Sequence, residues 1–535
     1  MKIESLLSVF ALSSLVSAIP TSLDSRALPL VQSNLLRRVL LRSNLLAKSK
    51  VLEGFAYATP ERNRVFGGPG HNATVNYIYD QIAALGDYYD VKFQPFVELY
   101  TAGNASLKVE GVDQKAGLFT YSPSGKFTQP LILVANNGCV AADYPATLTG
   151  NIALISRGTC QFGLKSALAG AAGAVAAVIY DNIDEPSLAG TLGAEVRPEG
   201  PLIPTAGITL ANGTALKNQL SGNRTLTADI NVISIRENRT TYNVIAQTKG
   251  GDPNNVLVLT AHTDSVDAGP GINDNGSGTV GILEVAIQLA KYSVNNAIRF
   301  VWVSAEEFGL LGSTFYVASL SDAERAKIRL ELNFDMIASP NYKYGIYDGD
   351  GSTFGLAGAP GSAQAEKLFQ DYFTNDAGLK YVADEFSGRS DYGPFLDVGI
   401  PAGGLFTGAE GIKTAEEQAL FGGQAGVAYD RNYHQAGDNV ANLNLEAFIQ
   451  NDKAIAHAVA TYGRSFESLP PRTPTRMVKR EGEVVGGKTR NGRFDKYFSG
   501  AVSSSVLEEY MVIDDSYGLV GHEIERVTVA RGFHL

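Results

Sequence analysis

The sequence predicts an α/β protein whose main domain is a layered sandwich, and two patterns support this. Between residues 240 and 465, short apolar runs typical of strands alternate with stretches typical of amphipathic helices. The run at 256–260 reads Val-Leu-Val-Leu-Thr, which indicates a strand covered on both faces. The expected strands are 256–260, 298–303 and 330–334, and the expected helices are 279–292 and 310–319.

Length and charge restrict the class of protein further. A chain of 535 residues exceeds one ordinary domain and indicates two or three. Its formal net charge of −11 and its pI near 5.2 argue against nucleic acid as the main partner.

The amino-terminal segment, residues 1–18, has the features of a secretory signal peptide. Lys2 precedes an apolar stretch that ends in small residues, and we expect cleavage after Ala18. This stretch is too short to cross a membrane, and no later run reaches 18 apolar residues. We therefore expect a protein without a membrane span that is secreted, or alternatively delivered to a vacuolar lumen. The next segment, 19–50, is Leu-rich and basic without a core-forming pattern, which suggests a propeptide.

Sequons and cysteines agree with passage through the secretory route. Glycosylation is expected at Asn72, Asn104, Asn212, Asn223 and Asn238. A sixth sequon, at Asn275, lies in a Gly-rich loop beside candidate site residues, and we expect it to stay bare. The only two cysteines, Cys139 and Cys160, are expected to form one disulfide in an oxidising compartment.

The remaining elements follow in order. Residues 51–104 begin the main domain, with a helix start expected at Thr59-Pro60-Glu61 and a second helix at 74–85. Residues 105–232 hold short β-rich runs, an Ala/Gly-rich helix at 165–176 and a strand at 177–180. After residue 465, Pro470 and Pro471 break the last helix, and 466–535 is expected to be an extension that is disordered or removed.

Five short motifs in the main domain carry side chains that bind metals. They contain His262 with Asp264, Asp274, Glu306 with Glu307, Asp335, and Tyr433 with His434. Three of these motifs follow predicted strands, where open α/β sheets place their ligands. The adjacent glutamates follow a buried strand, so they need a cation or a proton nearby. This inventory of imidazoles and carboxylates suits two zinc ions that share one carboxylate, and it points to a two-zinc hydrolase.

The segment 150–165, Gly-Asn-Ile-Ala-Leu-Ile-Ser-Arg-Gly-Thr-Cys-Gln-Phe-Gly-Leu-Lys, resembles the protease-associated domain. The resemblance implies that 105–232 is a non-catalytic, β-rich module inserted in a peptidase. The five motifs, with Ser387-Gly-Arg389-Ser-Asp391-Tyr-Gly-Pro-Phe, resemble the two-zinc aminopeptidase family that includes aminopeptidase Y and the secreted fungal leucine aminopeptidases. For the main domain, 51–104 with 233–465, this implies a three-layer sandwich with a mixed, mostly parallel sheet, the zinc exopeptidase fold.

The resemblance also implies a role for each residue. His262, Asp274 and Asp335 would hold one zinc, and Asp274, Glu307 and His434 the other. Glu306 would be the general base, Tyr433 would stabilise the oxyanion, and Asp264 would orient His262. The backbone carbonyl of Arg389 would receive the substrate's amino group together with Glu306 and Asp335, and Phe406 would line a pocket for a large apolar side chain such as Leu.

The expected partners are peptides and proteins with free amino termini, and we expect a monomer. A glutaminyl-cyclase-like transferase would use a single zinc, and a catalytically inactive receptor-like protein would lack ligands, so the complete set argues against both. A carboxypeptidase should carry a basic residue for the substrate's carboxylate. Some bacterial relatives have cysteines flanking the Tyr-His pair, whereas this chain has none there. The loop that presents His434 must therefore be held in another way.

Overall fold

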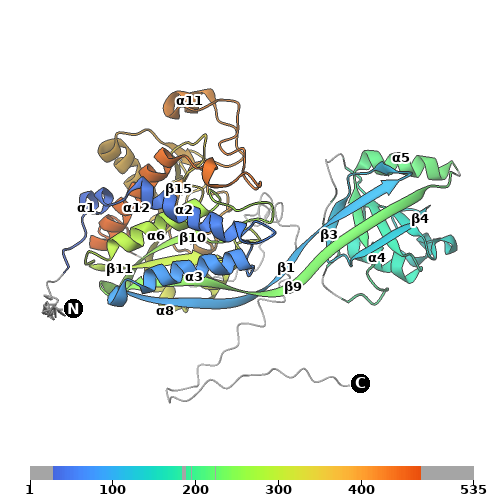
Figure 1. Ribbon diagram of the computed structural model, residues 1–535, viewed down its shortest axis with the longest axis horizontal. Coiled ribbons are helices and arrows are strands. Elements are labelled where there is room, and N and C mark those ends of the chain that lie inside the picture. The colour runs from blue at the N-terminus through green and yellow to red at the C-terminus, as the bar shows by residue number, and fades with distance from the viewer. Residues whose placement is uncertain (1–27, 184–187, 189, 194–195, 223, 472–535) are drawn as a thin grey trace, which may run out of the picture. The chain divides into compact units, whose positions relative to one another are not determined.

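The computed structural model describes residues 28–471 except 184–187, 189, 194–195 and 223. These residues form two compact units (Figure 1): residues 28–99 with 238–471, and residues 100–237. The predictions for the signal peptide, for Asn223 and for residues 472–535 lie outside the described residues.

The sheet of the first unit has the strand order β14-β13-β15-β12-β10-β11-β9. Its central strand β10 pairs in parallel with β11 and with β12, while β9 and β13 each make an antiparallel pairing. The mixed, mostly parallel sheet expected from the sequence is therefore confirmed. The strands are β9 (Thr227–Thr248), β10 (Asp252–His262), β11 (Asn296–Val303), β12 (Ile328–Phe334), β13 (Gly345–Tyr347), β14 (Val382–Asp384) and β15 (Ala402–Phe406).

Apolar side chains of β10 alternate between two separate cores, one on each face of the sheet. Leu257 and Leu259 belong to the core that the helices α6 and α12 cover. Val256 and Val258 belong to a second core with Tyr316 of α7. Helices on both faces of one sheet make three layers, which confirms the predicted sandwich. The helices of this unit are α1 (Ser33–Arg38), α2 (Arg42–Tyr57), α3 (Pro69–Ala83), α6 (Gly276–Leu289), α7 (Leu311–Ser319), α8 (Asp322–Lys327), α9 (Ser362–Asp371), α10 (Tyr392–Asp397), α11 (Ala415–Phe421) and α12 (Leu445–Arg464).

Part of the segment 19–50, for which we expected no core-forming pattern, packs into the main core. Leu36 of α1 and Leu45 of α2 are fully buried there, and α2 packs against α6. The expectation was wrong because the helical period is interrupted between the six-residue α1 and the longer α2, and α2 continues past residue 50 to Tyr57. Removal of this segment as a propeptide stays a prediction. At the other end, Phe466 and Leu469 of the predicted extension also lie in this core.

The helix start expected at Thr59-Pro60-Glu61 was also wrong. These residues form a turn after α2, and the proline in the first turn of the next helix is Pro69. The intervening chain passes the buried Arg64, whose guanidinium bonds to backbone carbonyls of the loop 263–271. A helix continuing from residue 60 is incompatible with the turn that brings Arg64 there.

In the second unit the strand order continues from β9 as β4-β5-β6-β8-β3-β7, and β1 pairs with β9 and with β2. The disulfide between Cys139 and Cys160 is present, as expected. The strands are β1 (Tyr89–Val109), β2 (Val112–Asp113), β3 (Gly117–Thr120), β4 (Gly125–Leu133), β5 (Ile152–Ser156), β6 (Ala176–Tyr180), β7 (Gly190–Thr191) and β8 (Thr205–Ile208), and the helices are α4 (Phe162–Ala171) and α5 (Leu210–Ser221).

The asparagines of the described sequons differ in their surroundings. Asn104 and Asn238 are exposed, whereas Asn72 and Asn212 each donate an amide hydrogen to a backbone carbonyl. Asn275 is fully buried and donates to the carbonyl of Phe334, which supports the expectation that it stays bare. Among the residues that the structure describes, none of the helices combines the length and apolar character needed to cross a bilayer.

We predict that Leu45→Ala lowers the free energy of unfolding by about 2–5 kcal/mol, because it leaves a cavity in the main core. Thermal or denaturant unfolding of the full chain measures this. Leu41→Ala is the matched control, since Leu41 is 52% exposed, and we expect a change within about 0.5 kcal/mol. Equal stability of the Leu45 variant and the wild type would contradict a structural role for this segment.

Candidate metal centre

The predicted site residues meet at the carboxyl ends of three neighbouring strands. His262 is the last residue of β10, Glu306 and Glu307 lie just past the end of β11, and Asp335 directly follows β12. Because β10 pairs in parallel with both neighbours, the three strand ends lie at one edge of the sheet. Asp274 comes from the loop before α6, and His434 from the loop after α11.

Asp274 lies between the two imidazoles. Its Oδ1 is 3.3 Å from His262 Nε2, and its Oδ2 is 3.2 Å from His434 Nε2. Glu307 Oε2 is 2.9 Å from the same nitrogen of His434. A carboxylate that presents one oxygen to each of two imidazoles has the arrangement of a bridging ligand.

The same Nε2 of His262 also faces two further carboxylates, those of Asp335 and Glu306. It is 3.5 Å from Asp335 Oδ1 and 3.7 Å from Glu306 Oε2. Two groups of three residues can each offer one ligand atom per residue, with the three atoms within 4.8 Å of one another. One group is His262, Glu306 and Asp335, and the other is His262, Asp274 and Glu307. Glu306 is thus about as close to His262 as Asp335 is, and these distances do not distinguish a metal ligand from a base. The assignment of Glu306 as the base therefore rests on the family resemblance.

The donor set fits a metal ion. Four buried atoms of these candidate ligands have no hydrogen-bond partner among the described residues, namely His262 Nδ1 and Nε2, Glu307 Oε1 and Asp335 Oδ1. Buried polar atoms are nearly always satisfied in native proteins, so this cluster of unsatisfied ligand atoms fits a bound cation. Imidazole nitrogens combined with carboxylate oxygens are the ligands that zinc prefers.

Burial sets the electrostatics of this cluster. Desolvation raises the pKa of Glu306 well above its usual range and the pKa of Glu307 to about 7. Burial lowers the pKa of His434, but its contacts with Asp274 and Glu307 outweigh this and raise the pKa to about 10. Several carboxylates close together and away from water therefore favour a bound cation.

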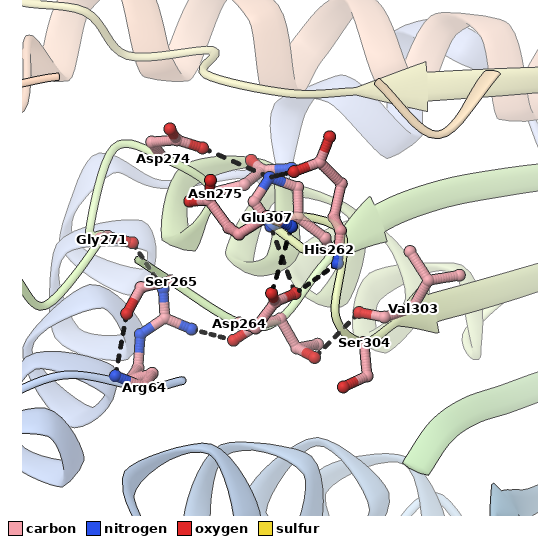
Figure 2. A network of polar contacts seen from close by, with 12 residues as sticks. Arg64, His262, Asp264, Ser265, Gly271, Asp274, Asn275, Val303, Ser304 and Glu307 are labelled. Atoms are coloured by element: carbon pink, nitrogen blue, oxygen red, sulfur yellow. Dashed lines mark hydrogen bonds and ion pairs between the residues drawn. The ribbon is translucent and has the colours of Figure 1, made fainter. Parts of the chain in front are cut away.

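Asp264 holds the backbone that carries the two glutamates. Its carboxylate accepts the N–H of Glu306 at 3.1 Å and that of Glu307, which Figure 2 labels, at 3.3 Å. Its Oδ1 lies 3.6 Å from His262 Nδ1, which is longer than a hydrogen bond. Ala305, directly before the pair, has φ of 57°, an unfavourable value for a residue with a side chain. Asp264 thus stabilises a strained turn that aims both carboxylates into the site.

Asp438, which was not predicted as a site residue, joins the two loops of the site. Its carboxylate accepts the N–H of Asn273 at 2.8 Å and that of Asp274 at 2.9 Å. Asp430 accepts the side-chain amide of Asn273 at 2.7 Å, so the segment 430–438, which contains His434, is fastened at both ends to the Asp274 loop. These contacts hold the His434 loop without flanking cysteines. The only sequence signal was the proximity of Asp438 to His434.

Two buried residues from the first hundred positions support the same loops. Arg64 donates from Nε to the carbonyl of Pro270 at 2.8 Å and from Nη2 to that of Gly271 at 2.5 Å (Figure 2). His71 Nε2 bonds to the hydroxyl of Thr263 at 2.8 Å, so it has a structural role. Neither residue carried a recognisable motif.

The three residues predicted to face a substrate lie beside this cluster or in the same sheet. The ring of Tyr433 stacks on His434 with 3.8 Å between centroids, and its hydroxyl accepts from Arg389 Nη2 at 3.2 Å. Arg389 Nη1 pairs with Glu410 at 2.8 Å, a side-chain role that the sequence did not suggest. Phe406 ends β15 and packs half-buried against an aromatic cluster that includes Tyr392.

Ser390, within the motif that contains Arg389, supports Asp335. Its hydroxyl donates to Asp335 Oδ2 at 2.6 Å and accepts from Asn333 at 2.7 Å. Asp335 Oδ1 is thereby left to face His262. The Ser390 hydroxyl thus links the 387–391 motif to the metal centre.

Comparison with known proteins gives matches in both units. A family model described as Peptidase family M28 matches residues 243–459, and one described as PA domain matches residues 127–216. A probable leucine aminopeptidase 2 of Aspergillus fumigatus is 58% identical over 452 residues, which are 84% of this chain and 89% of that protein.

Two solved structures share the fold. The aminopeptidase from Aneurinibacillus sp. strain AM-1 is 28% identical with a TM-score of 0.58, covering 80% of this chain and 95% of its own. BSAP, a zinc aminopeptidase from Bacillus subtilis, is 25% identical with a TM-score of 0.52, covering 77% of this chain and 94% of its own.

We predict that Asp438→Asn weakens zinc binding by about 10- to 100-fold, because an amide cannot accept both backbone N–H groups that position Asp274. Zinc titration of the folded protein measures this. Asp322→Asn, at a side chain that is 93% exposed, is the matched control and should bind zinc like the wild type. Unchanged affinity in the Asp438 variant would contradict its role in positioning Asp274.

Proposed function

This chain belongs to peptidase family M28, and on that basis we propose that it is a two-zinc aminopeptidase that releases single amino-terminal residues, preferably large apolar ones such as Leu. The observation that carries the proposal is the position of Asp274, with one oxygen toward each of two imidazoles. The leucine aminopeptidase at 58% identity and the zinc aminopeptidase of similar fold support the reaction and the metal.

The chain's own residues supply two ligand sets. His262, Asp274 and Asp335 would hold one zinc, and Asp274, Glu307 and His434 the other. When bound, the two ions would polarise the scissile carbonyl and lower the pKa of the attacking water toward neutrality. Two imidazoles on opposite oxygens of one carboxylate support two ions rather than one, which argues against a single-zinc transferase.

Glu306 acts as general base and then as general acid. It accepts the proton of the attacking water and returns it to the leaving amine. Asp264 keeps Glu306 aimed at the site through its bond to the Glu306 N–H.

Tyr433 stabilises the oxyanion of the tetrahedral intermediate. Its hydroxyl oxygen accepts from the Arg389 guanidinium, so the hydroxyl hydrogen is left to donate to the oxyanion. The positive charge of Arg389 strengthens that donor. Stacking on His434 limits where the ring can point.

Recognition of a free amino terminus follows from the negative charge of the site. Glu306 and Asp335, together with the backbone carbonyl of Arg389, receive the substrate's ammonium group. An acylated terminus lacks that charge and adds bulk where the carboxylates close the pocket. Phe406 would line the apolar pocket for the first side chain.

We extend the proposal to secretion, with residues 1–18 as the signal peptide. The disulfide between Cys139 and Cys160 supports passage through an oxidising compartment.

Glu306→Gln should retain both zinc ions while kcat falls by about 100- to 10,000-fold, because the amide cannot take the proton of water. Zinc content and turnover of a leucine anilide are measured on the same preparation. Glu307→Gln is the matched variant and should lose zinc. If the Glu306 variant loses zinc instead, the roles of the two glutamates are reversed.

A leucine anilide with a free amino group should be cleaved, and its N-acetylated form should not, because only the former carries the ammonium group. A zinc-selective chelator should abolish the activity, and added zinc should restore it. Comparable cleavage of the acetylated substrate would refute the aminopeptidase assignment. Activity that persists after verified zinc removal would refute the metal assignment.

A further inference from the structure

A second group of acidic side chains lies apart from the residues of the metal centre. Asp348 and Asp350 belong to the loop that follows β13, and Glu366 belongs to α9. One carboxylate oxygen of each lies within 4.8 Å of the other two. We name these three residues the β13–α9 cluster.

Two of the three carboxylates are removed from water. Asp348 is 0% and Glu366 is 4% exposed, whereas Asp350 is exposed. Burial raises the pKa of Glu366, and the charges of Asp350 and Asp348 raise it further. In the part of the chain that the structure describes, no Lys, Arg or His forms an ion pair with any member of the cluster. The cluster therefore lacks a counter-charge.

Asp348 has an unused oxygen. Its Oδ2 accepts the N–H of Thr353 at 3.0 Å and that of Phe354 at 2.8 Å, which fixes the carboxylate. Its Oδ1 is buried and has no hydrogen-bond partner among the described residues. A fully buried carboxylate oxygen without a donor is costly unless a cation or a proton neutralises it.

The other two carboxylates keep acceptor capacity after their own bonds are made. Glu366 accepts the side-chain amide of Gln370 at 2.7 Å on Oε1 and the N–H of Asp350 at 3.1 Å on Oε2. Asp350 Oδ1 accepts the N–H of Ser352 at 2.8 Å. Since each carboxylate oxygen has two lone pairs, both side chains remain available as ligands while the backbone holds them in place.

We infer that the β13–α9 cluster binds a calcium ion. All of its donor atoms are oxygens, and the absence of imidazole and thiolate favours a hard cation over zinc. Oxygen-bearing side chains alternate with glycine in Asp348-Gly-Asp350-Gly-Ser352, the spacing that lets one loop surround a calcium ion. Gly351 has φ of 74°, which allows the loop to turn back on itself.

The bound ion joins the loop to α9 and stabilises an aromatic wall. Tyr347, directly before Asp348, stacks on Phe386 with 5.2 Å between ring centroids. Both rings belong to the cluster against which Phe406 packs. Calcium therefore has a structural role here, separate from the chemistry of the metal centre and independent of the proposed reaction.

The test uses the full-length, zinc-loaded protein with zinc held constant. Calcium chloride should raise the melting temperature by about 5 °C at a hundredfold excess over Kd. Terbium chloride should give luminescence sensitised by nearby tyrosines such as Tyr347, and calcium should displace it. An equal stabilisation by magnesium chloride would overturn the assignment to calcium, as would the absence of any calcium-dependent shift.

Asp350→Asn is the informative variant because Asp350 is exposed, so its replacement should not disturb folding. It should weaken calcium binding at least tenfold and leave zinc content unchanged. Glu467→Gln, an exposed position outside the cluster, is the matched control for loss of one charge and should bind calcium like the wild type. A calcium response in the Asp350 variant equal to that of the wild type would overturn the proposal.

Discussion

Buried negative charge at the carboxyl ends of β10, β11 and β12 is the constraint on which the rest of the metal centre depends. Parallel pairing brings the three strand ends to one edge of the sheet, so their terminal side chains meet there. Desolvation raises the pKa of both Glu306 and Glu307, which reflects the free-energy cost of placing carboxylates away from water. Zinc binding offsets that cost, so metal affinity and the integrity of the site are coupled.

Three residues from separate parts of the chain hold this arrangement by acting on the backbone. Arg64 donates to carbonyls of the loop before Asp274, Asp264 accepts the N–H groups of the glutamate pair, and Asp438 accepts those of the Asp274 loop. Each bond fixes a turn rather than a ligand side chain. The ligand carboxylates thereby keep the free oxygens that a metal requires.

The strands and the ligand candidates were predictable because both leave a local signal. An apolar run such as 256–260 identifies a buried strand, and a histidine or carboxylate just after it is conspicuous. The β13–α9 cluster was not predicted, because Glu366 lies within an ordinary helical stretch. The packing of Leu36 and Leu45 was missed for a related reason, since α1 and α2 are separated by a break in the helical period.

The sequence by itself determined the alternation of strands and helices, the disulfide partners and the inventory of metal-binding side chains. Only the tertiary structure decided that Asp274 presents one oxygen to each imidazole, that Asp438 replaces a disulfide as the support of the His434 loop, and that Arg389 reaches Tyr433. These contacts join residues far apart in the chain, and they depend on strand register and loop direction. Local residue pattern carries no information on either.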